Sequence, residues 1–439
     1  MLDFVITAKL LIAVSSILAG LAFLRWPYIQ QISKQRFDYS AVVLLLFCRA
    51  GLFVIVMVLM RCEATADVVV YYDEARRTLA GGVPFKVFFT AYSPLFPYMA
   101  SVPLSLWDSP KAIMLVAIIL EACALPLWLQ FARGCFQERI VRNATVLYCV
   151  NPFSELTIPL MGQNHVWISF LLALSLTGAP QVGRRVRDFA SGFAFSLSTV
   201  LVKWLALLYA PVLFMRSTYR KYWLIALILP IVGLYGLWAT NFGASALVGN
   251  LKFHANMNSS GNLPYLLTIF GVNLSDGPTS AALAGLGLCL LGIVFLIPAI
   301  RLRHFSDLVT CCMLVAVTLT FLFASKKAFT YYLIMAFYPF CLVVASTRHK
   351  PLAYLPVLVF LGLAGIEPSL WFRWLHSANL NVITTTGFSA YRNQVLTFFC
   401  AEIALLIGYI VFVLESLNLA LSHHKDITAR PISSRSPDA

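Results

Sequence analysis

Long apolar runs separated by short polar turns recur from one end of the chain to the other. A helix of about 20 apolar residues is long enough to cross a bilayer. The pattern therefore predicts an all-α polytopic membrane protein with about 11–13 transmembrane or re-entrant helices. The predicted segments are 4–24, 40–60, 112–132, 143–160, 164–179, 188–202, 203–215, 222–241, 281–300, 307–324, 328–346, 352–370 and 394–416.

Two neighbouring segments, 188–202 and 203–215, are too short for two full crossings. Such a pair is expected to dip into the membrane and return, which is tolerated where the backbone is buried in protein or lines a cavity.

The composition agrees with a membrane protein. Of the 439 residues, 60% are hydrophobic and only 11% are charged, whereas a water-soluble domain carries roughly 25% charged residues. The formal net charge of +14 could indicate a nucleic-acid partner. The basic residues instead lie between the apolar runs, where they orient a membrane protein, so we expect membrane lipids as partners and no nucleic acid. The ten cysteines lie mostly within apolar runs, which argues against a disulfide framework.

The basic residues are concentrated in alternate turns, and the positive-inside rule places those turns in the cytoplasm. They include Arg25, Lys34, Arg36, Arg133, Arg139, Arg142, Arg184, Arg185, Arg187, Arg216, Arg220, Lys221, Arg301, Arg303, Arg348 and Lys350. The loops at 61–111, 242–280 and 371–393 then face outward, as do the turns at 162–165 and 325–327. We therefore expect one transmembrane domain over 1–416 and a disordered cytoplasmic tail over 417–439. The expected location is a bacterial plasma membrane, as a multi-pass protein with an extracytoplasmic active site.

The loop 61–111 is the most polar stretch outside the predicted membrane segments. Residues from about 70 to 80 predict a short interfacial helix that ends at Gly81 or Gly82. One face of this helix is expected to hold Tyr71, Ala75 and Leu79. Farther along, Tyr92 begins an aromatic, proline-rich turn that either lines a groove or closes the loop.

The carboxylates of this loop differ in their neighbours. Asp73 and Glu74 each have Arg77 within reach on a helix, which favours structural ion pairs. Asp67 has no cation at those offsets; it is an N-cap, a free acid able to act as general base, or both. Asp108 precedes Ser-Pro at the start of a membrane segment and is predicted to cap it.

Charges within the apolar runs need partners. Arg49 and Glu121 lie at comparable depths in consecutive segments, so we expect them to meet. Lys203 either pairs with Glu155 or meets an anionic ligand.

Lys326 and Lys327 form an isolated double cation at an outward turn, shortly before Tyr331 and Tyr332. The lysines either reach to lipid headgroups or clamp a phosphate, to which the tyrosine hydroxyls would add hydrogen bonds.

Two polar outer segments remain ambiguous. Gln163, Asn164 and His165 either bind sugar hydroxyls or satisfy buried backbone, and the loop containing His254, Asn256, Asn258 and Ser259 is of the same kind. The chain contains no HExxH or Cys/His cluster and no Walker or Rossmann glycine motif. We therefore expect no metal and no cofactor.

The order of the motifs resembles the GT-C superfamily, specifically the polyprenol-phosphate-mannose-dependent mannosyltransferases and the related arabinofuranosyltransferases. The resemblance covers about residues 40–345. Its motifs are Asp67, Tyr71, Leu79 to Phe85, Tyr92 to Pro94, Asn151-Pro152, Gly162 to Asn164, Val202 to Trp204, Ser325 to Lys327, Tyr331, Tyr332 and Pro339. The chain departs from the pattern at Ala328 to Thr330, where relatives often carry His and Gln-Tyr.

The resemblance implies an inverting, metal-independent glycosyltransferase. Its donor would be a sugar, expected to be mannose, on a polyprenyl phosphate, and its acceptor a hydroxyl of a glycan or glycolipid. Asp67 matches the catalytic position and would be the general base. The donor phosphate would meet Lys326, Lys327, Lys203, Tyr331 and Tyr332. The sugar or acceptor would meet Glu74, Tyr71, Tyr92, Gln163, Asn164 and His165.

Two other classes of protein fit the same composition. A secondary transporter or lipid flippase would place coupling charges near the membrane midplane and show inverted repeats. If the protein is a non-catalytic assembly subunit, glycosyl transfer would be lost only when a partner protein is also removed.

Overall fold

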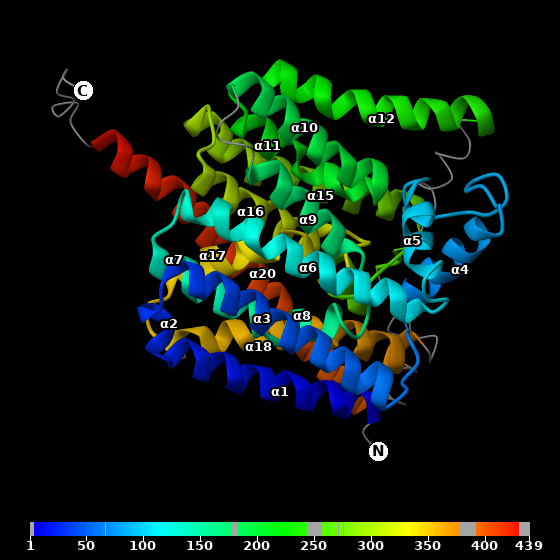
Figure 1. Ribbon diagram of the computed structural model, residues 1–439, viewed down its shortest axis with the longest axis horizontal. Helices are drawn as coiled ribbons and strands as arrows, with labels where there is room; N and C mark the ends of the chain where they lie inside the picture. The colour runs from blue at the N-terminus through cyan, green and yellow to red at the C-terminus, as the bar shows by residue number, and fades with distance from the viewer. Residues whose placement is uncertain are drawn as a thin grey trace.

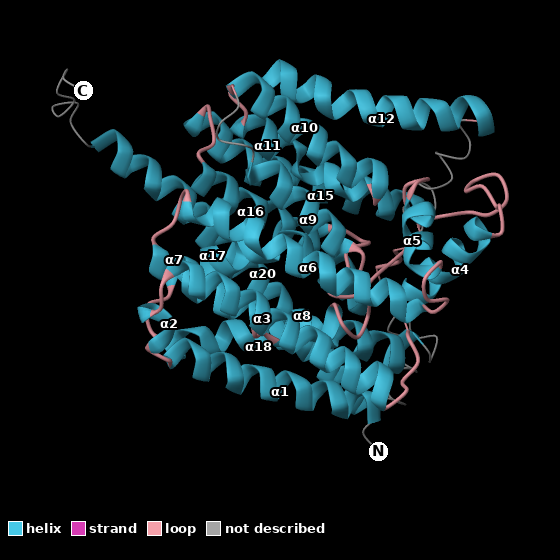
Figure 2. Ribbon diagram, viewed as in Figure 1, coloured by secondary structure: helices cyan, strands magenta, loops and turns pink. Residues whose placement is uncertain are grey.

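The computed structural model describes residues 4–65, 67–177, 183–243, 257–270, 272–274, 276–376 and 392–429. Within these ranges the fold is all-α and no strand is formed (Figure 2). The elements are α1 (Phe4–Arg25), α2 (Tyr28–Gln31), α3 (Lys34–Phe53), η1 (Val54–Leu59), α4 (Asp67–Leu79), α5 (Phe96–Leu104), α6 (Pro110–Arg133), α7 (Glu138–Cys149), α8 (Pro152–Thr157), α9 (His165–Thr177), α10 (Arg184–Leu201), η2 (Trp204–Tyr209), α11 (Ala210–Arg216), α12 (Arg220–Phe242), α14 (Leu263–Leu266), η3 (Leu267–Phe270), α15 (Gly277–Leu302), α16 (Asp307–Ala324), η4 (Thr330–Ala336), α17 (Phe337–Thr347), η5 (Pro351–Tyr354), α18 (Leu355–Leu370), η6 (Trp371–His376) and α20 (Arg392–Ala429).

Nine helical stretches in the described residues are long and apolar enough to cross a membrane. Together with two shorter apolar helices, His165–Thr177 and Trp204–Arg216, they reach the lower end of the predicted range. The predicted segment 143–160 is divided between α7 and α8, because Asn151 and Pro152 interrupt it and start a new helix.

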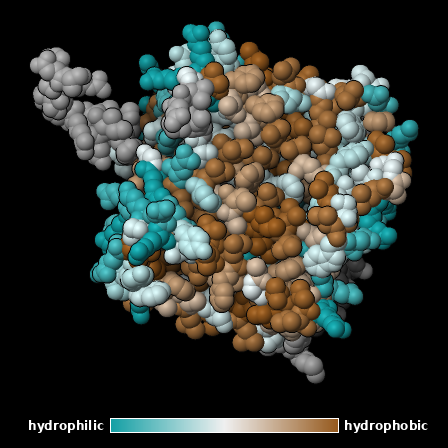
Figure 3. Space-filling view, in the orientation of Figure 1, coloured by the Kyte–Doolittle hydropathy of each residue, from teal (hydrophilic) through white to brown (hydrophobic). Residues whose placement is uncertain are grey.

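Most of the helices lie side by side along one direction (Figure 1). The short helix α2 and the start of α7 lie at one end, which we call the basic end because Arg133, the last residue of α6, and Arg142 of α7 lie there. The helices α4 and α5 lie at the opposite end, the loop end. Apolar side chains fill the middle of the face shown in Figure 3, and hydrophilic ones gather toward its margins. Many apolar side chains are exposed on the outside of the bundle, as a lipid-facing surface requires. Phe47, for example, is 76% exposed.

Arg49 is fully buried and joins three parts of the bundle. Its Nε lies 3.1 Å from Glu121 Oε2, which confirms the predicted pairing of α3 with α6. The guanidinium also donates to the carbonyls of Tyr148 and Cys149 at 3.1 Å each, where α7 ends. Glu155 lies 3.7 Å from the same guanidinium. The alternative in which Glu155 pairs with Lys203 is therefore wrong, because Arg49 needs more than one acceptor to be satisfied in the core.

The last helix is longer than the sequence predicts. Helix α20 continues to Ala429, so the predicted disorder beyond 417 does not hold for the residues up to that point. Just before this part, a salt bridge of 2.8 Å between Arg348 and Glu415 fixes α20 against the turn after α17. The remainder of the predicted tail, 430–439, lies outside the described residues.

Candidate functional site

Helix α4 supports the loop end of the molecule. It begins at Asp67, earlier than predicted, and ends before Gly81, whose φ of +85° favours glycine. Tyr71 and Ala75 are fully buried as predicted, but Leu79 is 53% exposed. Leu79 was therefore placed on the wrong face, because the buried stripe turns toward Thr78 at the end of the helix.

Asp67 is joined to the distant segment η4 by a direct hydrogen bond. Tyr331 Oη donates to Asp67 Oδ2 at 3.0 Å. In the described parts of the chain Asp67 forms no ion pair, as its sequence neighbours predicted. One carboxylate oxygen is thus held by Tyr331, and the acid is positioned without being neutralised by a cation.

Lys203 lies in the break between α10 and η2, outside the nine described helices that are long and apolar enough to cross a membrane, and is buried. Its Nζ donates to Tyr332 Oη at 3.4 Å and lies 5.2 Å and 5.1 Å from the ring centres of Tyr92 and Tyr332. Burial lowers the pKa of Lys203 to about 8, and the nearby Asp67 carboxylate only partly opposes this. An ammonium held between aromatic faces without a direct carboxylate partner is suited to meet an anion.

The turn that starts at Tyr92 is fixed to the end of α10. The Ser93 amide donates to the carbonyl of Val202 at 3.0 Å, and the Ser93 hydroxyl donates to the carbonyl of Val200. These bonds keep the Tyr92 ring beside Lys203. Tyr92 also meets Tyr71 edge to face at 5.0 Å, which connects α4 to the same aromatic cluster.

Glu74 faces the interior of the loop. Its Oε2 accepts a hydrogen bond of 2.9 Å from Thr90 Oγ1, and burial raises the pKa of Glu74 to about 8. The expected ion pair of Glu74 with Arg77 is not formed among the described residues; Arg77 pairs with Asp73 at 2.9 Å, as predicted. Glu74 thus orders the segment that leads to Tyr92, because Thr90 Oγ1 also accepts from the Tyr92 amide at 3.1 Å.

Asp108 does not cap α6. Ser109 is the N-cap residue, and its side chain accepts from the Lys111 amide. Asp108 instead accepts a hydrogen bond of 2.9 Å from Tyr72 Oη of α4. Ser109 takes the capping role predicted for Asp108, because the serine stands directly before Pro110, where the cap of a proline-started helix belongs.

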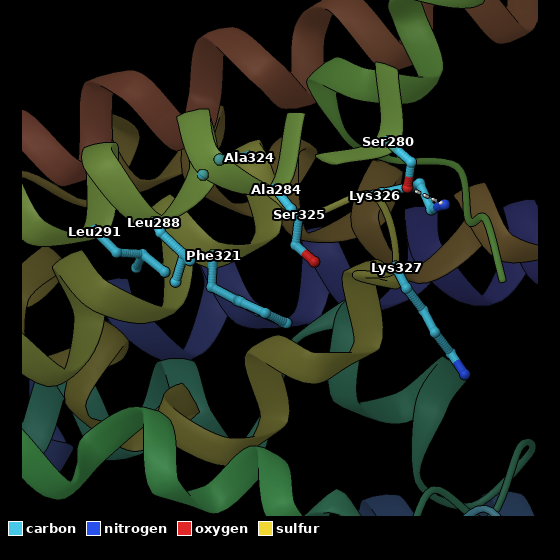
Figure 4. A pocket seen from close by; sticks show the side chains of 10 residues that line it. Ser280, Ala284, Leu288, Leu291, Phe321, Ala324, Ser325, Lys326 and Lys327 are labelled. Atoms are coloured by element: carbon cyan, nitrogen blue, oxygen red, sulfur yellow. Dashed lines mark hydrogen bonds between the residues drawn. The ribbon is translucent and has the colours of Figure 1, made fainter. Parts of the chain in front are cut away.

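The two adjacent lysines after α16 point in different directions (Figure 4). Lys326 donates to Ser280 Oγ at 2.8 Å and to the Leu274 carbonyl at 3.2 Å. Lys327 reaches Met257 Sδ at 3.1 Å. Burial and the charge of Lys203 lower the pKa of Lys327 to about 7. Of the two lysines, Lys327 is therefore the one that interacts electrostatically with Lys203 and Asp67.

The segment from Gln163 to His165 is completely buried, and its side-chain polar atoms have no hydrogen-bond partner in the described structure. The imidazole of His165 packs against Tyr332 at a centroid distance of 4.3 Å. Gly162, with φ +59°, permits this turn to press against Val68 of α4 and Met114 of α6. Buried polar groups are normally hydrogen-bonded to protein, water or ligand. These amides and this imidazole are therefore able to form hydrogen bonds with a bound molecule.

An apolar groove of about 320 Å³ lies between α15 and α16 and ends at the lysine turn (Figure 4). Its wall is formed mainly by Ala284, Gly287, Leu288, Leu291, Phe321 and Ala324, with Ser280, Ser325, Lys326 and Lys327 at the polar end. The groove thus combines an aliphatic trough with cations at one end.

The fold brings most of the predicted site residues into one place. Asp67, Lys203, Tyr331, Tyr332, Tyr92 and His165 are connected by the contacts above, Tyr71 borders them, and Lys327 interacts with them electrostatically. Lys326 and Glu74 are directed elsewhere. His254 and Asn256 lie outside the described residues. Thr90, which positions Tyr92, was not predicted, because it shows no sequence signal beyond being polar. Ser93 was noted only as part of the motif Tyr92 to Pro94, without a role of its own.

Comparisons with known proteins find a likeness in structure but none in sequence. No family model and no curated protein sequence matches the chain. A crystal structure of ArnT from Cupriavidus metallidurans bound to undecaprenyl phosphate is similar over 88% of this chain and 76% of that chain, with a TM-score of 0.47 and 15% sequence identity.

Proposed function

We propose that the protein is an integral membrane glycosyltransferase that moves a sugar from a polyprenyl-phosphate donor to an acceptor hydroxyl, with Asp67 as the general base. The observation that carries the proposal is the convergence of one acid and two amines from distant segments. Asp67 of α4 is bonded to Tyr331, and Lys203 contacts the neighbouring Tyr332. Lys327 interacts with both charges.

The reaction would be a single displacement. The acceptor oxygen attacks the anomeric carbon while the bond from that carbon to the phosphate oxygen breaks. The acceptor proton passes to the carboxylate of Asp67, and the bonding electron pair leaves with the phosphate. A positioned base of this kind contributes about 10²–10⁴ in rate. Tyr331 supports this role because its hydrogen bond fixes one oxygen of Asp67 and leaves the other for the acceptor.

The departing phosphate gains negative charge, which fixed cations stabilise. Lys203 is buried and has no carboxylate partner among the described ion pairs. Lys327 is half-buried and adds a second positive charge nearby, and Tyr332 Oη adds a donor. The polyprenyl chain would lie in the groove between α15 and α16, with its headgroup toward Lys326.

The sugar would be held by the polar groups that the fold leaves unsatisfied. Gln163 and Asn164 offer both donors and acceptors, which suits hydroxyl groups. Glu74 would act by holding Tyr92, and Tyr71 by backing it. That the sugar is mannose, and that the loop end faces the extracytoplasmic side of a bacterial membrane, rest on the motif resemblance and on the positive-inside rule.

The test is transfer of labelled mannose from polyprenyl phosphate to a lipid extract by the purified protein. Asp67→Asn should lower transfer by at least about a hundredfold, while retaining the hydrogen bond from Tyr331 and hence the fold. Asp73→Asn is the matched control, because Asp73 lies on the same helix and pairs with Arg77 at the surface. Full transfer by a folded Asp67→Asn protein would remove Asp67 as the base.

A further inference from the structure

Two glutamates outside the site described above meet in the protein interior. Glu367 lies near the end of α18 and Glu402 in α20, and both are completely buried. The amide of Gly261 donates to both carboxylate oxygens of Glu402 at 2.9 Å. A methyl group at Gly261 would lie 3.4 Å from Glu367 Oε2. The two carboxyl groups therefore approach each other at the backbone of Gly261.

Neither acid has a positive partner. In the parts of α18, α20 and the rest of the chain that the structure describes, no lysine, arginine or histidine forms an ion pair with Glu367 or Glu402. Two carboxylates in contact cannot both stay charged in the interior unless a cation accompanies them. The neutralising group is therefore either a shared proton or a bound metal ion.

The surroundings are rich in oxygen atoms. Tyr409 Oη is buried next to both acids and has no hydrogen-bond partner in the described structure. The hydroxyls of Ser260 and Thr330 adjoin Glu367, and Thr330 donates its proton to the Ala364 carbonyl at 2.6 Å, so its lone pairs stay available. No sulfur or imidazole ligand is needed in such a set, and carboxylate, hydroxyl and carbonyl oxygens are what hard cations bind.

We propose that Glu367 and Glu402, with the neighbouring hydroxyls, bind one hard divalent cation of the Mg²⁺ or Ca²⁺ class. A divalent ion matches the two negative charges, whereas a monovalent ion leaves one uncompensated. The unpartnered Tyr409 hydroxyl is the second observation that points to a ligand here. The proposal does not rest on glycosyl transfer, because the acids are separate from Asp67 and its partners.

The cation would brace the turn that carries the lysines. The Ser259 amide donates to the Lys326 carbonyl at 3.0 Å, and Ser259 Oγ accepts from the Ala328 amide at 2.8 Å. Asn262 holds the same loop by donating to the Ser259 carbonyl at 2.7 Å. Through Gly261 this loop contacts Glu402. Occupancy of the acid pair would thus stiffen the backbone beneath Lys326 and Lys327.

The test uses the full-length protein, washed with a chelator in non-ionic detergent. Ca²⁺ or Mg²⁺ should raise its melting temperature by several degrees, because a ligand that binds only the folded state stabilises it. Glu367→Gln and Glu402→Gln keep the side-chain shape and should each abolish the shift. Glu63→Gln, which removes an exposed acid of the outer loop, is the control and should retain it.

A second measurement does not depend on the variants folding. Tb³⁺, bound in place of Ca²⁺, should show luminescence sensitised by Tyr265 and Tyr409, which border the acids, and Ca²⁺ should displace it. The proposal is overturned if neither divalent ion changes the melting temperature of the wild type, or if Na⁺ alone does. It is also overturned if a folded Glu402→Gln protein keeps the divalent shift or the displaceable Tb³⁺ signal.

Discussion

Replacing Lys203 by methionine should make the protein more stable and less able to bind its donor. Lys203 is buried between Tyr92 and Tyr332 and forms no ion pair with any residue that the structure describes. Burial lowers its pKa from 10.5 to about 8. Between those two pH values the unfolded chain binds more protons than the folded one, so stability rises with pH across that window. Below pH 8 the full cost of the buried charge is present.

The size of the effect follows from the pKa. A shift of this extent corresponds to about 3 kcal/mol of lost stability at pH 7. Cation–π contacts with two rings, at about 0.5–1 kcal/mol each, return part of it. Lys203→Met should therefore raise the free energy of unfolding at pH 7 by about 1–2 kcal/mol. Loss of one charge-assisted hydrogen bond to a phosphate, at about 1.5–3 kcal/mol, should weaken donor binding by roughly tenfold to a hundredfold.

The assay compares melting temperature and donor KM for the wild type and Lys203→Met from pH 7 to pH 10. The wild type should become more stable above pH 8, and the variant should lack that rise. Lys86→Met, which alters an exposed lysine of the same outer loop, should behave as the wild type. A Lys203→Met protein that is less stable at pH 7 and keeps the wild-type donor KM would refute the reasoning, since Lys203 would then be a structural cation.

Three further results are expected. Glu121→Ala leaves the buried Arg49 without its main partner and should destabilise the protein by about 3–5 kcal/mol, measured as a lower melting temperature, with Glu121→Gln milder. Gly162→Ala should cost about 1–3 kcal/mol and weaken transfer, because the methyl group would meet Met114 Cγ at 2.7 Å at a φ of +59°; an unchanged melting temperature contradicts this. Donor KM should rise between pH 7 and pH 9, because Lys327, with its pKa lowered to about 7, loses its charge there; the rise should be smaller in Lys327→Arg, which stays charged.

The membrane helices could be predicted from the sequence because a single physical demand, apolar length, determines them. The pairing of Arg49 with Glu121 followed in the same way, since a buried charge requires a partner at its own depth. The helix α5 was not predicted, because its nine residues lie within a polar loop and carry prolines at both ends. Short helices depend on tertiary packing rather than on sequence pattern.

Many residues of the candidate site could be selected from the sequence as neighbours in space, but their internal arrangement could not. Lys326 and Lys327 are neighbours in the sequence, yet the backbone of the turn sends them to different partners. Glu367 and Glu402 are each a lone acid in an apolar run, which is a signal in itself. Their meeting could not be foreseen, because it depends on which helices pack together and on the loop that brings Gly261 between them.

The groove between α15 and α16 has a consequence for how the protein would be measured. If its occupant is the polyprenyl chain, the substrate arrives from within the bilayer plane, and its concentration is a mole fraction of the lipid rather than an amount per litre. Adding inert phospholipid at constant donor per volume should then slow the reaction, although nothing in the aqueous phase has changed. Apparent affinities determined at different detergent or lipid ratios would have to be normalised to the area of membrane before they are compared.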